Sequence, residues 1–420
     1  MAVETTGAST ALITNDAVVL GILMLILGLV FWTSSRTEGF WKKFYGIVPA
    51  LLLCYLSPSI LNSFGWIDGA ASGLYPMARD FLLPSALVLL CVAIDFGAIV
   101  RLGPKAVIMF LTGTLGVMLG AVVAFQAMGV INPDVIAGET WRGMTTVAGS
   151  WIGGGANQAA MKEVFEVEAT MFGQFVAVDV LVASVWMAVL LFLAGRAHAF
   201  DRWTGADVSA IDDLKQRIEA YQAEHARNPS LTDLMLILAL GLGATGLAHF
   251  ITDPLVAWIS SLPPEWNLRN YSLTAKFFWI TVLATTFGLL LSFTRARTLE
   301  GAGASKIGSV MLYVLVATIG MQMDLGALLD RPGLFLLGAI WILVHGTLML
   351  VVAKLIRAPL FFLAVGSQAN IGGAASAPVV ASAFHPSLAP VGVLLAVLGY
   401  ALGTYCAYMT GLLLRWMAGA

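Results

Sequence analysis

The sequence predicts an all-α polytopic membrane protein of about 12 transmembrane helices, or 13 at most, in two inverted repeats with two crossed, broken helices. Three observations carry this prediction. Of the 420 residues, 59% are hydrophobic and 11% are charged, whereas soluble domains have about 45–50% apolar and about 25% charged residues. Apolar runs of bilayer-spanning length recur along the chain. A Gly-rich polar interruption occurs at a similar place in each half of the chain.

This composition excludes several classes of protein. A water-soluble enzyme or a disordered chain would carry more charge. The net charge is only −2, so no nucleic-acid partner is expected. The cysteines Cys54, Cys91 and Cys406 form no disulfide framework. No Walker A motif, metal cluster or catalytic-triad spacing is evident, so we expect neither a bound cofactor nor enzymatic activity.

The predicted spans are continuously apolar and not alternating, which favours helices over a β-barrel. The first, Ala17–Ser35, has no basic segment before it and no small-residue cleavage site, so it is expected to be a retained helix and not a signal peptide. A short additional crossing at 253–272 would make thirteen. The other predicted spans are 45–62, 78–98, 106–129, 143–165, 170–195, 231–252, 273–294, 307–325, 333–356, 359–383 and 388–414.

A polar connector divides the chain near its middle, because Arg196–Asp233 holds 12 of the 46 charged residues. Apolar residues recur at helical spacing over 208–221, which indicates either an amphipathic helix on the membrane surface or a plain linker helix. The predicted division into domains follows from this connector. It comprises N-terminal panel or dimerisation helices (1–77), the first half of the core (78–195), the connector (196–233), second panel helices (234–300) and the second half of the core (301–420).

The two halves contain similar elements in the same order. Asp95-Phe-Gly-Ala-Ile99 and Asp324-Leu-Gly-Ala-Leu328 each end an apolar span, and a proline that can open the next helix follows each of them. Basic residues near the span ends predict that the two Asp-ending spans run in opposite directions, so the repeats would be inverted. These residues are Arg36, Lys42, Lys43, Arg101, Lys105, Arg295, Arg297, Lys306, Lys354, Arg357 and Arg415.

The two interruptions, in the predicted broken helices 143–165 and 359–383, are the strongest pointers to a binding site. Consecutive glycines weaken a helix, and a bilayer offers no water to the freed backbone, so such a segment must line a cavity or be buried in protein. Close packing through small residues explains the glycines, but it explains the buried amides poorly. The predicted ion and substrate residues here are Ser150, Gly154, Gly155, Asn157, Gln158, Ser367, Gln368, Asn370, Gly372, Gly373 and Ser376.

Asp179 is the one acid near the centre of the apolar run 169–193, and an intramembrane acid indicates function. It could bind Na⁺, carry a proton or bond to opened backbone. No Asp, Glu, Lys or Arg occurs over 358–414, so a cation site there would use neutral oxygens such as that of Thr404. Neutral oxygens with one carboxylate favour Na⁺, with Asn157, Asp179 and Asn370 as the expected ligands.

The Ser150-Trp-Ile-Gly-Gly-Gly-Ala-Asn157 motif, the span around Asp179 and Asn370-Ile-Gly-Gly-Ala resemble the YjcL-like family of uncharacterised bacterial membrane proteins. That family is distantly similar to the bile acid/sodium symporter and cation/proton antiporter superfamily. The resemblance implies a core with crossed, broken helices, a panel or dimerisation domain, and elevator-type movement. The paired acids of the antiporters are absent, since only Asp179 stands at that place.

These observations predict a multi-pass secondary active transporter of the bacterial inner membrane. It would be coupled to Na⁺ and would move a small organic solute, for which an anionic group is one option, and it would form a homodimer. Two alternatives remain open. One is a cation/proton antiporter with Asp179 as the exchanging carboxylate. The other, an intramembrane enzyme or a sensor, lacks a visible nucleophile or His/acid cluster.

Overall fold

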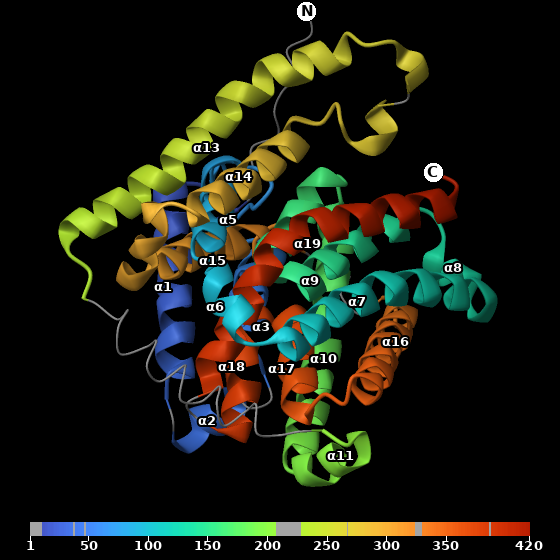
Figure 1. The fold of residues 1–420 in the computed structure, drawn as a ribbon. Coiled ribbons are helices and arrows are strands. Elements are labelled where there is room, and N and C mark those ends of the chain that lie inside the picture. The colour runs from blue at the N-terminus through green and yellow to red at the C-terminus, as the bar shows by residue number, and fades with distance from the viewer. Residues whose placement is uncertain are drawn as a thin grey trace, which may run out of the picture.

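The computed structural model describes residues 11–36, 38–45, 48–206, 228–266, 268–323, 330–385 and 388–420. Apart from one isolated β-bridge between Ile13 and Ile67, these residues form helices and their connections (Figure 1). The all-helical prediction is confirmed for this part of the chain. The predicted helix at 208–221 and the motif Asp324–Leu328 lie outside the described residues.

The first half of the chain builds helices up to α11. Their bounds are α1 (Asp16–Ser34), α2 (Gly39–Tyr45), α3 (Ala50–Ser63), α4 (Leu74–Met77), the π-helical turn η1 (Ala78–Leu82), α5 (Leu83–Val92), α6 (Phe96–Arg101), α7 (Pro104–Ile131), α8 (Pro133–Ile136), α9 (Thr140–Val164), α10 (Ala169–Ala194) and α11 (Ala197–Thr204).

The second half begins with one of the longest helices of the molecule. The bounds are α13 (Leu231–Ser260), the 3₁₀ turns η2 (Pro264–Trp266) and η3 (Leu268–Tyr271), α14 (Lys276–Ser292), the 3₁₀ helix η4 (Arg295–Ala302), α15 (Ala304–Gly320), α16 (Gly333–Leu355), α17 (Leu360–Ile371), α18 (Gly373–Phe384) and α19 (Ala389–Ala418).

Local sequence signals explain where several helices begin. The side chain of Asn15 accepts the backbone N–H groups of Ala17 and Val18 at the start of α1, and Ser230 forms a capping box with Asp233 at the start of α13. Pro104 opens α7, where a missing N–H costs nothing. Asp95 caps α6 and also receives Arg297 Nη1 at 2.8 Å, so this acid has a structural role.

Seven helices in the described residues are long and apolar enough to cross a membrane, or up to nine if each of two bent pairs forms one span. This number is below the predicted twelve because several predicted spans are short or interrupted. α15 has 17 residues and α17 has 12, while α9 is broken inside. At 253–272, α13 ends at Ser260 and only the short turns η2 and η3 follow, so the described residues contain no thirteenth span there.

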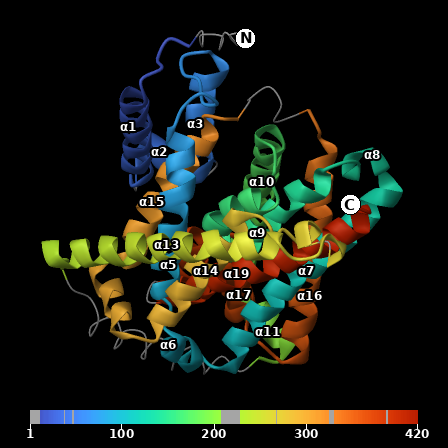
Figure 2. The same cartoon turned by 90° about the horizontal axis from the view of Figure 1, so that it is seen from above.

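The helices form two packed groups that meet in the middle of the molecule; in Figure 2, α1, α3 and α15 of the first lie at the left, and α7 and α16 of the second lie at the right. In the first, which we call the scaffold group, α5 packs on α13, α14 and α15, and α1 and α3 pack on α15. In the second, the core group, α9 packs along α19, α7 along α16, and α17 and α18 against α19. α10 packs on α9 and α16 within the core group. The predicted domain boundaries remain a prediction.

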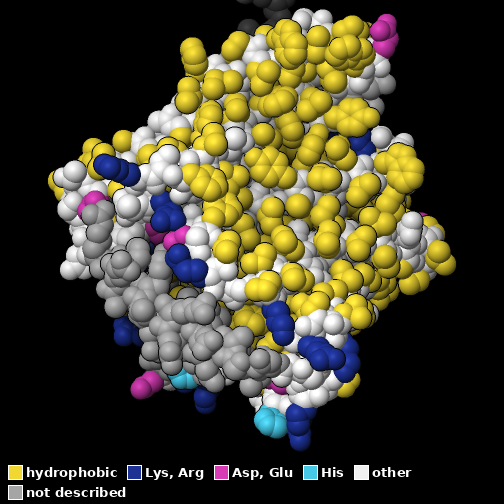
Figure 3. Space-filling view, viewed as in Figure 1, with side chains coloured by type: hydrophobic (Ala, Val, Ile, Leu, Met, Phe, Trp, Pro, Cys, Tyr) yellow, Lys and Arg dark blue, Asp and Glu magenta, His cyan; other side chains and the backbone are white. Residues whose placement is uncertain are grey.

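Hydrophobic side chains cover a wide, continuous area of one face, over α13, α14 and α19 (Figure 3). In α13, Leu242, Leu247 and Phe250 are among the exposed residues. Charged side chains gather mostly toward the edge of this face. A patch of this size is far larger than a soluble monomer exposes, and it fits contact with lipid.

The close contact between α9 and α19 depends on glycines. A Cβ atom added at Gly403 would lie 2.6 Å from Gly153 Cα and 2.6 Å from Asn157 Nδ2. Both distances are shorter than real Cβ contacts, and Gly153 Cα is backbone that cannot rotate away. Glycine at these positions therefore allows the two helices to approach closely, as small residues do in membrane proteins.

We predict that Gly403→Ala lowers the free energy of unfolding by about 1–3 kcal/mol, the usual cost of overpacking. The matched control is Gly246→Ala in α13, where an added Cβ meets nothing within 4 Å. That control should be neutral or slightly stabilising, because Ala favours a helix. Thermal unfolding in detergent measures both, and equal effects of the two variants would contradict the packing argument.

Candidate functional site

Two interrupted helices meet in the middle of the core group. Within α9 the backbone leaves the helix at Gly154, with φ 73° and ψ −173°. The second interruption lies between α17 and α18, where Gly373 has φ 58°. A Cβ atom added at Gly373 would lie 3.7 Å from Gly154 Cα, so the two breaks are adjacent. Both predicted interruptions are therefore present, and glycine supplies the left-handed backbone each requires.

A cavity of about 150 Å³ opens beside these breaks. An engineered cavity of about this volume holds a ligand the size of benzene. Of the thirteen predicted site residues, seven line it, together with apolar side chains such as Leu51 and Met187. The seven are Ser150, Gly154, Gly155, Asp179, Gln368, Gly372 and Ser376.

Asp179 lies on α10 and is 4% exposed. Its carboxylate accepts three hydrogen bonds, all from α9. Ser150 Oγ donates to Oδ2 at 2.6 Å, Trp151 Nε1 to Oδ1 at 2.6 Å, and Gln158 Nε2 to Oδ2 at 2.9 Å. These donors stand on both sides of the break at Gly154. The carboxylate therefore joins the two halves of the interrupted helix through three side-chain donors.

Gln368 forms the opposite wall of the cavity. Its Nε2 donates to Ser376 Oγ at 2.7 Å, across the break between α17 and α18. Its Oε1 is buried without a hydrogen-bond partner, and the whole residue is 1% exposed. A buried oxygen of this kind costs about 1–3 kcal/mol unless a ligand satisfies it. The cavity lining thus includes the carboxylate of Asp179, two serines and the side chain of Gln368.

Asn157 and Asn370 lie outside the cavity lining. Each of them connects two helices, and the two residues use the same pattern of hydrogen bonds. Asn157 Nδ2 donates to the carbonyls of Gly153 and Tyr400, and its Oδ1 accepts the Thr404 hydroxyl at 2.6 Å. Asn370 Nδ2 likewise donates to the carbonyls of Gly366 and Phe110, and its Oδ1 accepts the Thr114 hydroxyl at 2.8 Å. In each case the amide joins its own helix to a neighbour. These bonds occupy both polar atoms of the two amides.

The remaining predicted residues are also placed beside the cavity and not in its lining. Gln158 is bonded to Asp179, and its Oε1 accepts the Tyr55 hydroxyl at 3.5 Å. Ser367 accepts Trp186 Nε1 at 2.8 Å and lies 2.8 Å from His345 Nε2. Thr404 lines a separate, largely apolar cavity of about 160 Å³ with residues of α14, α9 and α19.

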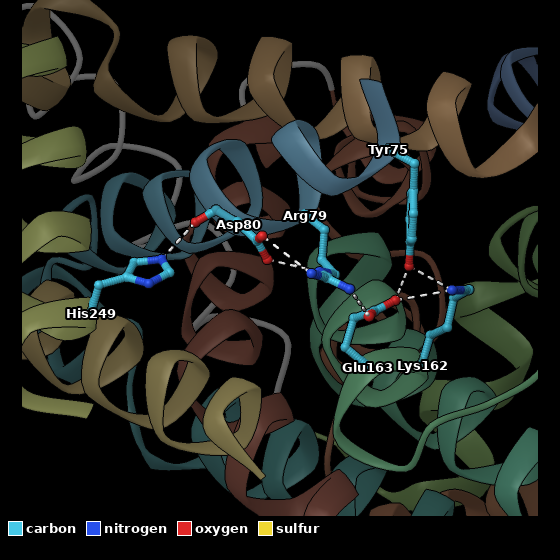
Figure 4. Close-up of polar contacts among 6 residues, drawn as sticks. All are labelled: Tyr75, Arg79, Asp80, Lys162, Glu163 and His249. Atoms are coloured by element: carbon cyan, nitrogen blue, oxygen red, sulfur yellow. Dashed lines mark hydrogen bonds and ion pairs between the residues drawn. The ribbon is translucent and has the colours of Figure 1, made fainter. Parts of the chain in front are cut away.

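Several residues at the site escaped the sequence analysis. Tyr55 and Trp151 occur in apolar segments with nothing to mark them as site residues, and only the three-dimensional contacts reveal their role. Arg79 and Asp80, by contrast, were a visible charged pair at the start of an apolar span. In the structure Arg79 lies close to Glu163. Glu163 does not line the cavity and contacts Tyr75, Arg79 and Lys162 (Figure 4).

We predict that Thr114→Val, which leaves Asn370 Oδ1 without its donor, lowers the free energy of unfolding by about 1–3 kcal/mol. Thr112→Val on the same helix is the control, because the Thr112 hydroxyl bonds only to the Ile108 carbonyl one turn earlier. The control should cost clearly less. Chemical or thermal unfolding in detergent compares the two variants. An equal loss of unfolding free energy in both would contradict the bridging role of Asn370.

Comparison with known proteins places the chain among membrane proteins of unknown function. A family model described as a protein of unknown function (DUF819) matches residues 21–417. An uncharacterized membrane protein, YjcL of Bacillus subtilis, is 24% identical over 381 residues, which cover 88% of this chain and 90% of that protein. These matches confirm the family resemblance expected from the motifs. The chain belongs to the DUF819 family of membrane proteins, a family whose function is unknown.

Proposed function

We propose that this protein is a secondary active transporter of the bacterial inner membrane that couples Na⁺ to the movement of a small organic solute. One observation carries the proposal: two helix breaks, one from each half of the chain, meet at a cavity that contains the buried carboxylate of Asp179. Interrupted helices at membrane depth are tolerated where they line a cavity, and paired interruptions mark transporter binding sites. No enzymatic activity is part of this proposal.

The packing supports two related repeats. In chain order, α5, α7, α9 and α10 correspond to α15, α16, the α17–α18 pair and α19. Corresponding helices pack on each other, α5 on α15 and α7 on α16, as expected for repeats around a pseudo-two-fold axis. The inverted orientation rests on the distribution of basic residues.

The oxygen atoms around the cavity favour a hard monovalent cation. Asp179, Ser150, Ser376 and the unpartnered Gln368 Oε1 offer oxygen ligands, which suit Na⁺ better than nitrogen or sulfur ligands would. Asp179 is the charged residue in the described lining, and no Lys or Arg accompanies it there. An anionic solute would therefore depend on the bound cation to balance its charge. This set replaces Asn157 and Asn370 as the proposed first ligands, because those amides are engaged between helices.

Both breaks lie in the core group, and this favours an elevator-type mechanism. In such a mechanism the core group would carry the cavity past the scaffold group. We also propose a homodimer, in which part of the exposed apolar surface of α1 and α13 contacts a second copy of the chain and the rest contacts lipid. Chemical cross-linking in native membranes tests that oligomeric state.

We predict that NaCl raises the unfolding temperature of the purified protein relative to equal concentrations of KCl or choline chloride. At a Na⁺ concentration 100 times the dissociation constant, the stabilisation is about 2.7 kcal/mol. Asp179→Asn should abolish it, whereas Asp253→Asn, which removes an exposed carboxylate paired with Lys276, should not. If Na⁺ has no effect but pH does, through Asp179, the protein is a cation/proton antiporter instead.

Gln368→Leu should separate stability from ion binding. The variant removes the unpartnered oxygen and also the Nε2 bond to Ser376, so the free energy of unfolding without Na⁺ should change little, because the lost desolvation cost offsets the lost hydrogen bond. The Na⁺ concentration for half-maximal stabilisation should rise about tenfold, which corresponds to the loss of one favourable ligand. An unchanged Na⁺ midpoint in thermal-shift titrations would exclude Gln368 as a ligand.

A further inference from the structure

A second, partly buried polar cluster is shown in Figure 4. None of its members lines the cavity. Tyr75 comes from α4, and Arg79 and Asp80 come from the π-helical turn η1. Lys162 and Glu163 stand at the end of α9. A π-helical turn inside a longer helix is rare and frequently marks a functional position.

Glu163 stands at the centre of the contacts. Its carboxylate accepts the Tyr75 hydroxyl and Lys162 Nζ, the latter at 2.9 Å, and lies 3.8 Å from Arg79 Nη1. Lys162 Nζ also donates to the Tyr75 oxygen at 2.6 Å and lies 4.5 Å from the centre of that ring. Arg79 in turn pairs with Asp80 at 2.7 Å. His249 of α13 extends this network of polar contacts, because its Nε2 lies 2.8 Å from the Asp80 backbone carbonyl oxygen.

The cluster is neutral overall but poorly hydrated at one end. Its charged members are two cations and two anions. The side chains of Lys162 and Glu163 are 8% and 13% exposed, whereas those of Arg79 and Asp80 are 35% and 34% exposed. Lys162 and Glu163 therefore depend on Tyr75 and Arg79 for part of their solvation. Separating such groups leaves incompletely paired charge in a region of low dielectric constant.

The cluster connects the core group to the scaffold group. Lys162 and Glu163 belong to α9, which is part of the core group and carries the break at Gly154. Tyr75, Arg79 and Asp80 precede α5 directly, and α5 packs on α13, α14 and α15 of the scaffold group. The bonds from Glu163 to Tyr75 and Arg79 thus cross the boundary between the two groups.

We infer that this cluster is a latch that holds the core group against the scaffold group in the conformation described here. The inference rests on the proposed elevator mechanism, because a latch has meaning only if the two groups move. Movement of α9 along the scaffold group has to break the contacts of Glu163 with Tyr75 and Arg79. Weakening those contacts then shifts the equilibrium toward the other conformation without changing the cation site.

The test uses the full chain in membrane vesicles with a reporter cysteine at Ala183, a cavity-lining position on α10. Labelling by a membrane-impermeant maleimide is measured from each side of the membrane. Glu163→Gln should change the ratio of the two labelling rates by about tenfold, equivalent to the loss of one charge-assisted interaction. Tyr75→Phe, which leaves every charge in place, should change the ratio in the same direction by a smaller factor.

Two controls separate a latch from a general loss of structure. Asp253→Asn removes a carboxylate from the exposed pair with Lys276, which lies within the scaffold group, and should leave the ratio unchanged. Arg79→Gln combined with Glu163→Gln should change the ratio by less than the sum of the two single effects, because both variants remove the same contact. If Glu163→Gln and Tyr75→Phe both keep the parent ratio, the cluster is not a latch.

The Na⁺ thermal shift in the same variants distinguishes this inference from the proposed function. Glu163→Gln should retain the shift, because Glu163 does not line the cavity. A retained shift with an unchanged labelling ratio overturns the latch and leaves Na⁺ binding intact. Absence of the shift in the parent protein overturns the proposed coupling, and the labelling ratio still decides whether the two groups are latched.

Discussion

A helix interrupted inside a bilayer has to satisfy its freed polar groups within the protein, and the arrangement around the two breaks follows from this constraint. Asn157 Nδ2 donates to the backbone carbonyl of Gly153 beside the break in α9, and the Asp179 carboxylate joins the two parts of that helix by accepting side-chain donors from both sides of Gly154. Gln368 and Ser376 bond across the other break. Four side chains that bridge the interruptions, those of Ser150, Asp179, Gln368 and Ser376, also line the cavity. Stability and the candidate site therefore share these side chains.

Two asparagines connect the broken helices to the neighbouring helices. Asn157 and Asn370 each bond to a glycine carbonyl one turn earlier, to a carbonyl of a neighbouring helix and to a threonine one turn further along that neighbour. Amides of this kind fix the position of the broken helices relative to α19 and α7. Their burial is understandable as a structural requirement, whereas the unpartnered oxygen of Gln368 is not.

Much of the architecture could be predicted because its signals are local. The apolar runs, the Gly-rich breaks and the isolated Asp179 are visible in short windows of sequence, and seven of the thirteen predicted residues do line the cavity. What could not be predicted depends on distant contacts. No local pattern indicates that Tyr55 reaches Gln158, or that Asn157 meets α19. The predicted number of spans stays a prediction, since hydropathy cannot distinguish a complete span from a shorter helix such as α15 or α17.

The second half of α9 limits the sequence changes that this protein can accept. Gln158 bonds to Asp179 near the break, and Glu163 lies five residues later at the charged cluster. A single-residue insertion between them would rotate everything beyond it by about 100° around the helix axis and shift it by about 1.5 Å. Ala159, Ala160 and Met161 between them are buried, so both the side chains and the length of this segment are constrained. Related sequences should therefore keep this spacing free of insertions and deletions.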